Sequence, residues 1–170
     1  MTKFVIRVLL FLVAWVFMLQ SQESTTVRAI PGQLAGRWVV KRMLPTNTIS
    51  CWSQKEADSF IGTELQYSRD QFRWKNVVVK NPQTEISVLS AEEFHARFSG
   101  GNANSSQVNL KELGPSQERV TMIKIFHPPA NITGGTIEIP GDQVFLKDPI
   151  TIIVTACNVY FEAKKVEKAQ

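Results

Sequence analysis

The chain has few of the side chains that most enzymes use for chemistry. It contains only two histidines and two cysteines among 170 residues. His95 and His127 are far apart in the chain, and neither has an acidic partner at a spacing typical of a catalytic group. A zinc site that joined them to Cys51 and Cys157 would lack the short paired spacings of structural zinc. We therefore predict no metal, no cofactor and no catalytic residue, and a protein that is not an enzyme.

Charge of one sign is not in large excess either. The formal net charge is +4, and two of the positive charges, Lys3 and Arg7, precede an apolar run over residues 8–19. A short uncharged run behind basic residues is typical of a secretory signal peptide, and it is short for a membrane span. We expect an exported protein, periplasmic or secreted, with an uncleaved N-terminal anchor, and membrane contact only through it, as the alternative. The predicted divisions are a signal peptide or anchor at 1–21, a polar linker at 22–33, a single domain at 34–166 and a tail at 167–170.

Without the first 21 residues the chain keeps 17 basic and 15 acidic side chains. Such a balance gives no support for nucleic-acid binding. The remaining 149 residues are enough for one domain with a core of its own, and we expect it to be monomeric.

The two cysteines have a different meaning in an exported chain than in the cytosol. An oxidising compartment lets cysteines pair and remain paired. We predict a disulfide between Cys51 and Cys157, with two separate buried thiols as the alternative.

Short runs of alternating apolar and polar residues fill most of the chain after the N-terminal segment. In the stretch QFRWKN, Phe72 and Trp74 fall on one face of a strand, while Arg73 and Lys75 fall on the other. Short links such as GD, DP and CN separate the later runs and favour hairpins. About nine such runs need a barrel or a sandwich to hide their edges, and we predict an all-β antiparallel up-and-down barrel of about eight strands. The runs are 37–43, 63–68, 72–79, 84–90, 119–126, 136–140, 143–147, 151–156 and 159–165.

Two helix starts are encoded locally. Ser53 lies three residues before Glu56, which is a capping box, and Gly62 follows at a position suited to a helix end. Ser90 and Glu93 repeat the box. We therefore predict one or two short helices beside the strands.

The start and the end of the domain resemble one known group of proteins. Gly36-Arg37-Trp38 is similar to the G-x-W signature of lipocalins and other calycins, and VYFEAKK at 159–165 resembles the final barrel strand of such proteins. The stretch from 49 to 74 is similar to small exported bacterial calycin-like proteins. The second lipocalin signature, T-D-Y-x-x-Y, is absent. The resemblance implies structural roles for Gly36 and Trp38, with Lys164 or Lys165 packed across the tryptophan and Lys164 taken as the first choice.

The sequence is compatible with two uses of such a barrel. In the first, an internal cavity lined by Tyr67, Phe72, Trp74 and Ile86 binds a small hydrophobic molecule. In the second, the barrel is filled, and its outside or a loop binds an exported protein, as inhibitors of proteases or lysozyme do. We expect the first.

Overall fold

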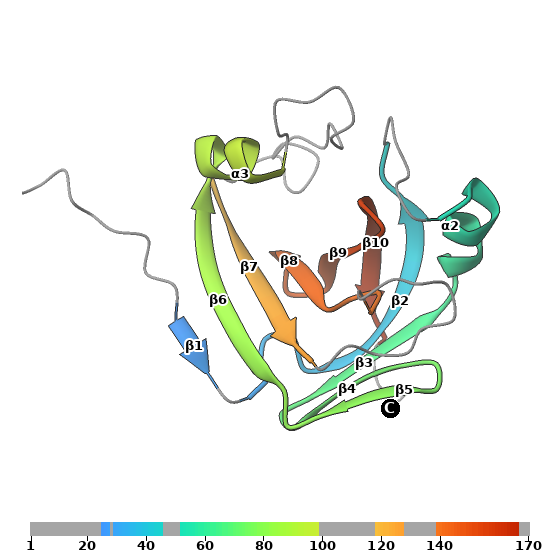
Figure 1. Cartoon of the computed structure of the whole chain (residues 1–170), viewed down its shortest axis with the longest axis horizontal. Coiled ribbons are helices and arrows are strands. Elements are labelled where there is room, and N and C mark those ends of the chain that lie inside the picture. The colour runs from blue at the N-terminus through green and yellow to red at the C-terminus, as the bar shows by residue number, and fades with distance from the viewer. Residues whose placement is uncertain (1–24, 28, 46–51, 99–117, 128–138, 167–170) are drawn as a thin grey trace, which may run out of the picture.

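The computed structural model describes residues 25–27, 29–45, 52–98, 118–127 and 139–166 (Figure 1). The predicted signal peptide or anchor at 1–21, the tail at 167–170 and Cys51 lie outside these ranges. Within them the protein is an antiparallel β structure with two short helices, which confirms the all-β class. No helix in the described ranges is long and apolar enough to cross a membrane. The strands are β1 (Thr25–Val27), β2 (Gly36–Met43), β3 (Glu64–Ser68), β4 (Gln71–Trp74), β5 (Val77–Lys80), β6 (Gln83–Ser90), β7 (Arg119–Phe126), β8 (Gln143–Asp148), β9 (Thr151–Ala156) and β10 (Val159–Lys165), and the helices are α2 (Gln54–Phe60) and α3 (Ala91–Phe98).

All ten strands belong to one sheet in the order β1-β6-β7-β8-β9-β10-β2-β3-β4-β5. Every pair of neighbours is antiparallel, and β10 pairs with β2, so the last strand of the meander lies beside its first. The sheet does not close into the predicted barrel, because β1 and β5 remain as its two edges. Figure 1 shows that the sheet nevertheless bends strongly, with β6 and β7 facing β2 across the interior.

A corner between β5 and β6 interrupts the hydrogen-bonded pairing of strands that follow one another in the chain. Only Asn81 and Pro82 separate the two strands, and β5 pairs with β4 whereas β6 pairs with β7. Asn81 has a positive φ of 47°, and its N–H donates to the Asp70 carbonyl at 2.6 Å. Proline has no N–H to offer to a neighbouring strand. The chain therefore turns sharply here and passes from one part of the sheet to the other without pairing β5 with β6.

The segment predicted as a polar linker contributes to the fold, which corrects that expectation. Thr25–Val27 form β1 on the edge of β6, and the buried Thr84 hydroxyl donates to the Ala29 carbonyl at 2.8 Å. Ile30 is buried in the core. Any residue can supply backbone N–H and C=O groups, so the pairing of three residues leaves little trace in composition. The polar character of 22–33 therefore does not reveal that this segment contains a strand.

Both predicted helices form, and their capping boxes are made. The Ser53 hydroxyl accepts from the Glu56 N–H, and the Glu56 carboxylate accepts from the Ser53 N–H at 2.7 Å. The Ser90 and Glu93 pair makes the same two contacts at the start of α3. Gly62, with φ of 85°, follows the end of α2 as predicted.

Turn residues set the boundaries of two hairpins. Cys157 and Asn158 have φ of 50° and 63°, and they join β9 to β10. Positive φ at both central residues is the mark of a type I′ turn, whose twist matches that of the strands. A second turn at Lys75 and Asn76 divides the predicted run 72–79 into β4 and β5.

The concave side of the sheet, which we call the inner face, carries the larger core. Side chains from β2 to β5 and from β7 to β10 meet in one cluster that includes Trp38, Phe72, Val79 and Ile123. Since residues near both ends of the sheet share this cluster, the sheet wraps round one apolar core.

The outer face of β7 to β10 is buried as well. Phe94 of α3 packs edge-on against Phe145 of β8, with ring centroids 5.5 Å apart, and Tyr160 of β10 lies in the same cluster. Burial on both faces accounts for the nearly continuous burial along TIIVTA of β9, where alternation is lost. Figure 1 shows α3 at the end of β6 and β7, and α2 beside β2.

Candidate functional site

The four residues predicted to line a cavity lie in the core or at its margin. Tyr67 and Phe72 are buried on β3 and β4, and their rings stack with centroids 4.8 Å apart. Trp74 and Ile86 are partly buried and pack against the same cluster. The structure therefore brings these side chains to the interior, as alternation predicted, but there they form part of the packed core.

Tyr67 is also fixed by its hydroxyl. The hydroxyl donates to the Gly141 carbonyl at 2.8 Å, and a Cβ at Gly141 would lie 2.6 Å from this oxygen. Burial, together with the nearby Asp142 carboxylate, raises the pKa of Tyr67 well above its ordinary value of 10.0. Tyr67 therefore acts as a neutral hydrogen-bonded core residue.

A pocket of about 680 Å³ opens on the inner face of β6, β7 and β8, and none of the four predicted residues lines it. Val88, Thr121 and Leu146 are paired in register across the three strands and form one row of its wall. Val88 is 42% exposed, although Ile86, on the same face of β6, packs against the core. The core thus ends between these two residues, and the pocket begins where it ends.

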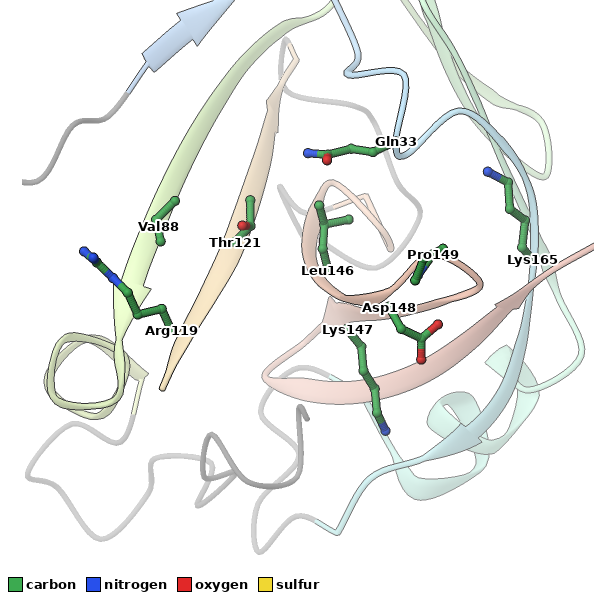
Figure 2. A pocket seen from close by; sticks show the side chains of 9 residues that line it. All are labelled: Gln33, Val88, Arg119, Thr121, Leu146, Lys147, Asp148, Pro149 and Lys165. Atoms are coloured by element: carbon green, nitrogen blue, oxygen red, sulfur yellow. The ribbon is translucent and has the colours of Figure 1, made fainter. Parts of the chain in front are cut away.

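The opposite side of the pocket comes from other parts of the chain. Gln33 precedes β2, Pro149 lies in the turn between β8 and β9, and Lys165 ends β10. Figure 2 shows the Gln33 amide extending toward β7, across the hollow from Val88 and Thr121. The wall therefore combines apolar surface from three residues with six polar or charged side chains.

Lys165 is held over the ring of Trp38. The two residues are paired between β10 and β2, and the Lys165 ammonium lies 5.1 Å from the centre of the Trp38 ring. A Cβ at Gly36 would lie 2.7 Å from Cε of this lysine, so glycine leaves the path of its side chain open. The Trp38 indole is fully buried, and its N–H donates to the Leu34 carbonyl at 2.8 Å. The sequence motif G-x-W is thus explained by one contact between the first and last strands of the meander.

The choice of Lys164 for this contact is wrong. Lys164 points to the opposite face, where its ammonium contacts the Thr151 hydroxyl at 2.5 Å. Phe161 and Ala163 belong to the inner core, so alternation along β10 carries Lys165 inward and Lys164 outward.

The outer face holds a compact charge cluster round Glu162. Its carboxylate accepts from Arg42 at 2.9 Å and from Lys147 at 3.1 Å, and Lys164 lies at 4.0 Å. Burial opposes ionisation, but the hydrogen bonds from Arg42 and Lys147 outweigh it and lower the pKa of Glu162. Lys147 also lines the pocket, but its ammonium group is paired with Glu162 in this cluster.

One acidic residue, Asp148, also lines the pocket. Its Oδ1 accepts from the Ile150 N–H at 2.9 Å, within the turn between β8 and β9. Burial opposes ionisation here too, but hydrogen bonds from Ile150 and Thr151 and the charge of Lys164 prevail and lower the pKa of Asp148. This carboxylate therefore stabilises the turn by a hydrogen bond, and the positive charge of Lys164 balances its negative charge.

The two histidines differ in exposure, and one of the two cysteines lies among the described residues. His95 is exposed on α3, whereas the side chain of His127 is 6% exposed and its Nε2 lies 3.0 Å from an Asp142 oxygen. Cys157 is buried in the turn between β9 and β10, and Cys51 lies outside the described residues. Among the residues that the structure describes, no three His, Cys, Asp or Glu side chains form a group that could hold a metal ion.

Comparison with protein-family models, with curated proteins and with solved structures gives no match for this chain.

The sequence contained part of the information that locates the pocket. Val88 lies on the same face as Ile86 in the run TEISVLS, so its inward direction was predictable, but its exposure was not. Lys165 could have been found by alternation from Ala163. Gln33 had no local signal, because only the path of the chain before β2 brings it to the pocket.

Proposed function

We propose that this protein is an exported, non-enzymatic binding protein of the lipocalin-like calycin type, which takes up a small hydrophobic molecule in the pocket beside Val88. The main observation in support of this proposal is the pocket itself. Its volume of about 680 Å³ falls within the range of known small-molecule sites, and Val88, Leu146 and Pro149 give it an apolar wall. Val88, 42% exposed on the concave face, offers apolar surface that a hydrophobic ligand can cover.

Two structural features support the calycin relationship. If β5 and β6 are counted as one strand bent at Asn81, the meander from β2 to β10 has eight strands, the number expected for the barrel. The tryptophan of the first strand and a basic residue of the last, Trp38 and Lys165, are in contact as the resemblance implies.

The proposal is tested with a neutral hydrophobic probe, N-phenyl-1-naphthylamine. We expect saturable binding of one probe per chain, measured by fluorescence titration. Val88→Trp should weaken it strongly, because the larger ring would project into the pocket from a site where the wild-type side chain is already exposed.

Val78→Trp is the matched control. Val78 is 38% exposed on β5 and does not line the pocket, so this variant should bind the probe as the wild type does. A wild-type protein that shows no saturable binding, or two variants with the same affinity, would overturn the proposal. Native mass spectrometry of the purified protein should in addition reveal a co-purified small molecule.

A further inference from the structure

We propose that the molecule bound in this pocket is an anionic amphiphile, and that the ammonium group of Lys165 binds its negatively charged end. This inference rests on the function proposed above and adds the chemical class of the ligand. It follows from the charges on the pocket wall and from the contacts that already engage each of them.

Three cationic side chains and one carboxylate line the pocket. Lys147 donates to Glu162 on the outer face at 3.1 Å, and Asp148 serves its own turn. Arg119 is exposed at the start of β7, near enough to Glu93 to help lower the pKa of that carboxyl. In Figure 2 the charged ends of Arg119 and Lys147 point away from Gln33, at the outer margin of the hollow.

Lys165 differs from the other two cations. Among the described residues it forms no ion pair, and its contact is with the face of the Trp38 ring at 5.1 Å. The ring attracts the cation but gives its N–H groups no oxygen acceptor. A partly buried lysine whose ammonium keeps free donors favours an anionic ligand over a neutral one.

Its position is also fixed. The side chain passes over Gly36, where no Cβ blocks it, and the Lys165 N–H donates to the Ile150 carbonyl at 2.9 Å. A preorganised charge loses less entropy when it binds than a freely moving surface lysine does. The apolar row of Val88 and Leu146 on the facing wall then fits the tail of an amphiphile.

The test compares three ligands of equal chain length: decanoate, decan-1-ol and decyltrimethylammonium. The affinity of each ligand is measured by its displacement of N-phenyl-1-naphthylamine at low ionic strength. The proteins compared are the wild type and two variants, Lys165→Met and Lys164→Met. Methionine keeps most of the apolar stem over Trp38 while removing the charge. Lys164 is the matched control, because it is the adjacent lysine on the opposite face.

We expect the wild type to bind decanoate about tenfold more tightly than decan-1-ol, and the cationic ligand least well. Lys165→Met should lose this preference with decan-1-ol affinity unchanged, and Lys164→Met should keep it. Equal affinity for the acid and the alcohol, or an equal loss for both in Lys165→Met, would overturn the anionic class while leaving the apolar pocket intact. Failure of all three ligands and of the probe would overturn the proposed function, and this inference with it.

Discussion

Position 36 shows how one residue satisfies two independent demands. Gly36 has a φ of 138°, a backbone conformation that side chains disfavour, and its missing Cβ leaves room for Lys165. The glycine therefore permits the lysine to cross the strand and reach the face of Trp38.

Gly36→Ala should lower the free energy of unfolding by about 1–3 kcal/mol, the usual cost of holding a non-glycine residue in such a conformation. Denaturant unfolding measures it. The double variant with Lys165→Ala separates the two demands, because it removes the clash at 2.7 Å but not the backbone cost. A single variant as stable as the wild type would contradict this account of G-x-W.

At the scale of single elements, α3 depends on its first turn. The helix has only eight residues, too few to be stable in isolation, and it begins directly where β6 ends. The Glu93 N–H donates to the Ser90 hydroxyl at 3.2 Å, and the Glu93 carboxylate accepts from the Ser90 N–H at 2.7 Å. These hydrogen bonds from the Ser90 backbone and side chain lower the pKa of Glu93. The cap thus orients the helix so that Phe94 reaches the outer core.

Ser90→Ala should destabilise the protein by about 1 kcal/mol, because it leaves one N–H at the start of α3 without its partner. Urea unfolding gives the value. Ser90→Thr keeps a hydroxyl cap and should lie within about 0.5 kcal/mol of the wild type. If both variants lose the same free energy of unfolding, the effect comes from the packing of β6 and not from the cap.

At the scale of the whole molecule, Glu162 joins three strands. Arg42 of β2 and Lys147 of β8 both donate to this one carboxylate of β10. Because its pKa is lowered in the folded protein, the ionised carboxylate adds stability above the ordinary pKa of 4.5, and this stability is lost as the pH falls through the lower folded-state pKa.

Glu162→Gln should therefore cost about 1 kcal/mol at pH 7, the difference between charged and neutral hydrogen bonds. The gap between variant and wild type should shrink toward zero as the pH falls from the ordinary pKa of 4.5 through the lower pKa of the folded state. Unfolding free energies over a pH series that starts at neutral pH and continues into the acid range test this. Glu64→Gln is the control, since the Glu64 ion pair with Arg37 is exposed and contributes little. A gap for Glu162→Gln that is independent of pH would contradict the charge cluster as its cause.

The Cys51–Cys157 disulfide remains a prediction for the chain as a whole. Trp52, the residue after Cys51, lies against Phe161 in β10, the strand that follows Cys157, with ring centroids 6.3 Å apart. A bridge closing a loop of about a hundred residues would stabilise the fold by at most about 4.7 kcal/mol. We expect no free thiol in the unreduced, unfolded protein, and two after reduction. Titration of two thiols before reduction would exclude the bridge.

The sequence by itself determined the local features of this protein. Alternation in QFRWKN placed Phe72 inward, two capping boxes started two helices, and the CN link formed a type I′ hairpin. These features depend on residues within a few positions of one another, so a local pattern is enough to specify them.

The tertiary structure alone decided how those pieces meet. Between β2 and β10 the register shifts, so that Glu162 and Ala163 face Arg42 and Val40, and Lys41 is an extra residue in β2. Simple alternation from Trp38 and Val40 would have turned Arg42 into the core, but this bulge turns it outward to Glu162. The corner after β5 and the pocket beside Val88 are decided in the same way. Such features depend on the register between strands distant in sequence, which no local periodicity encodes.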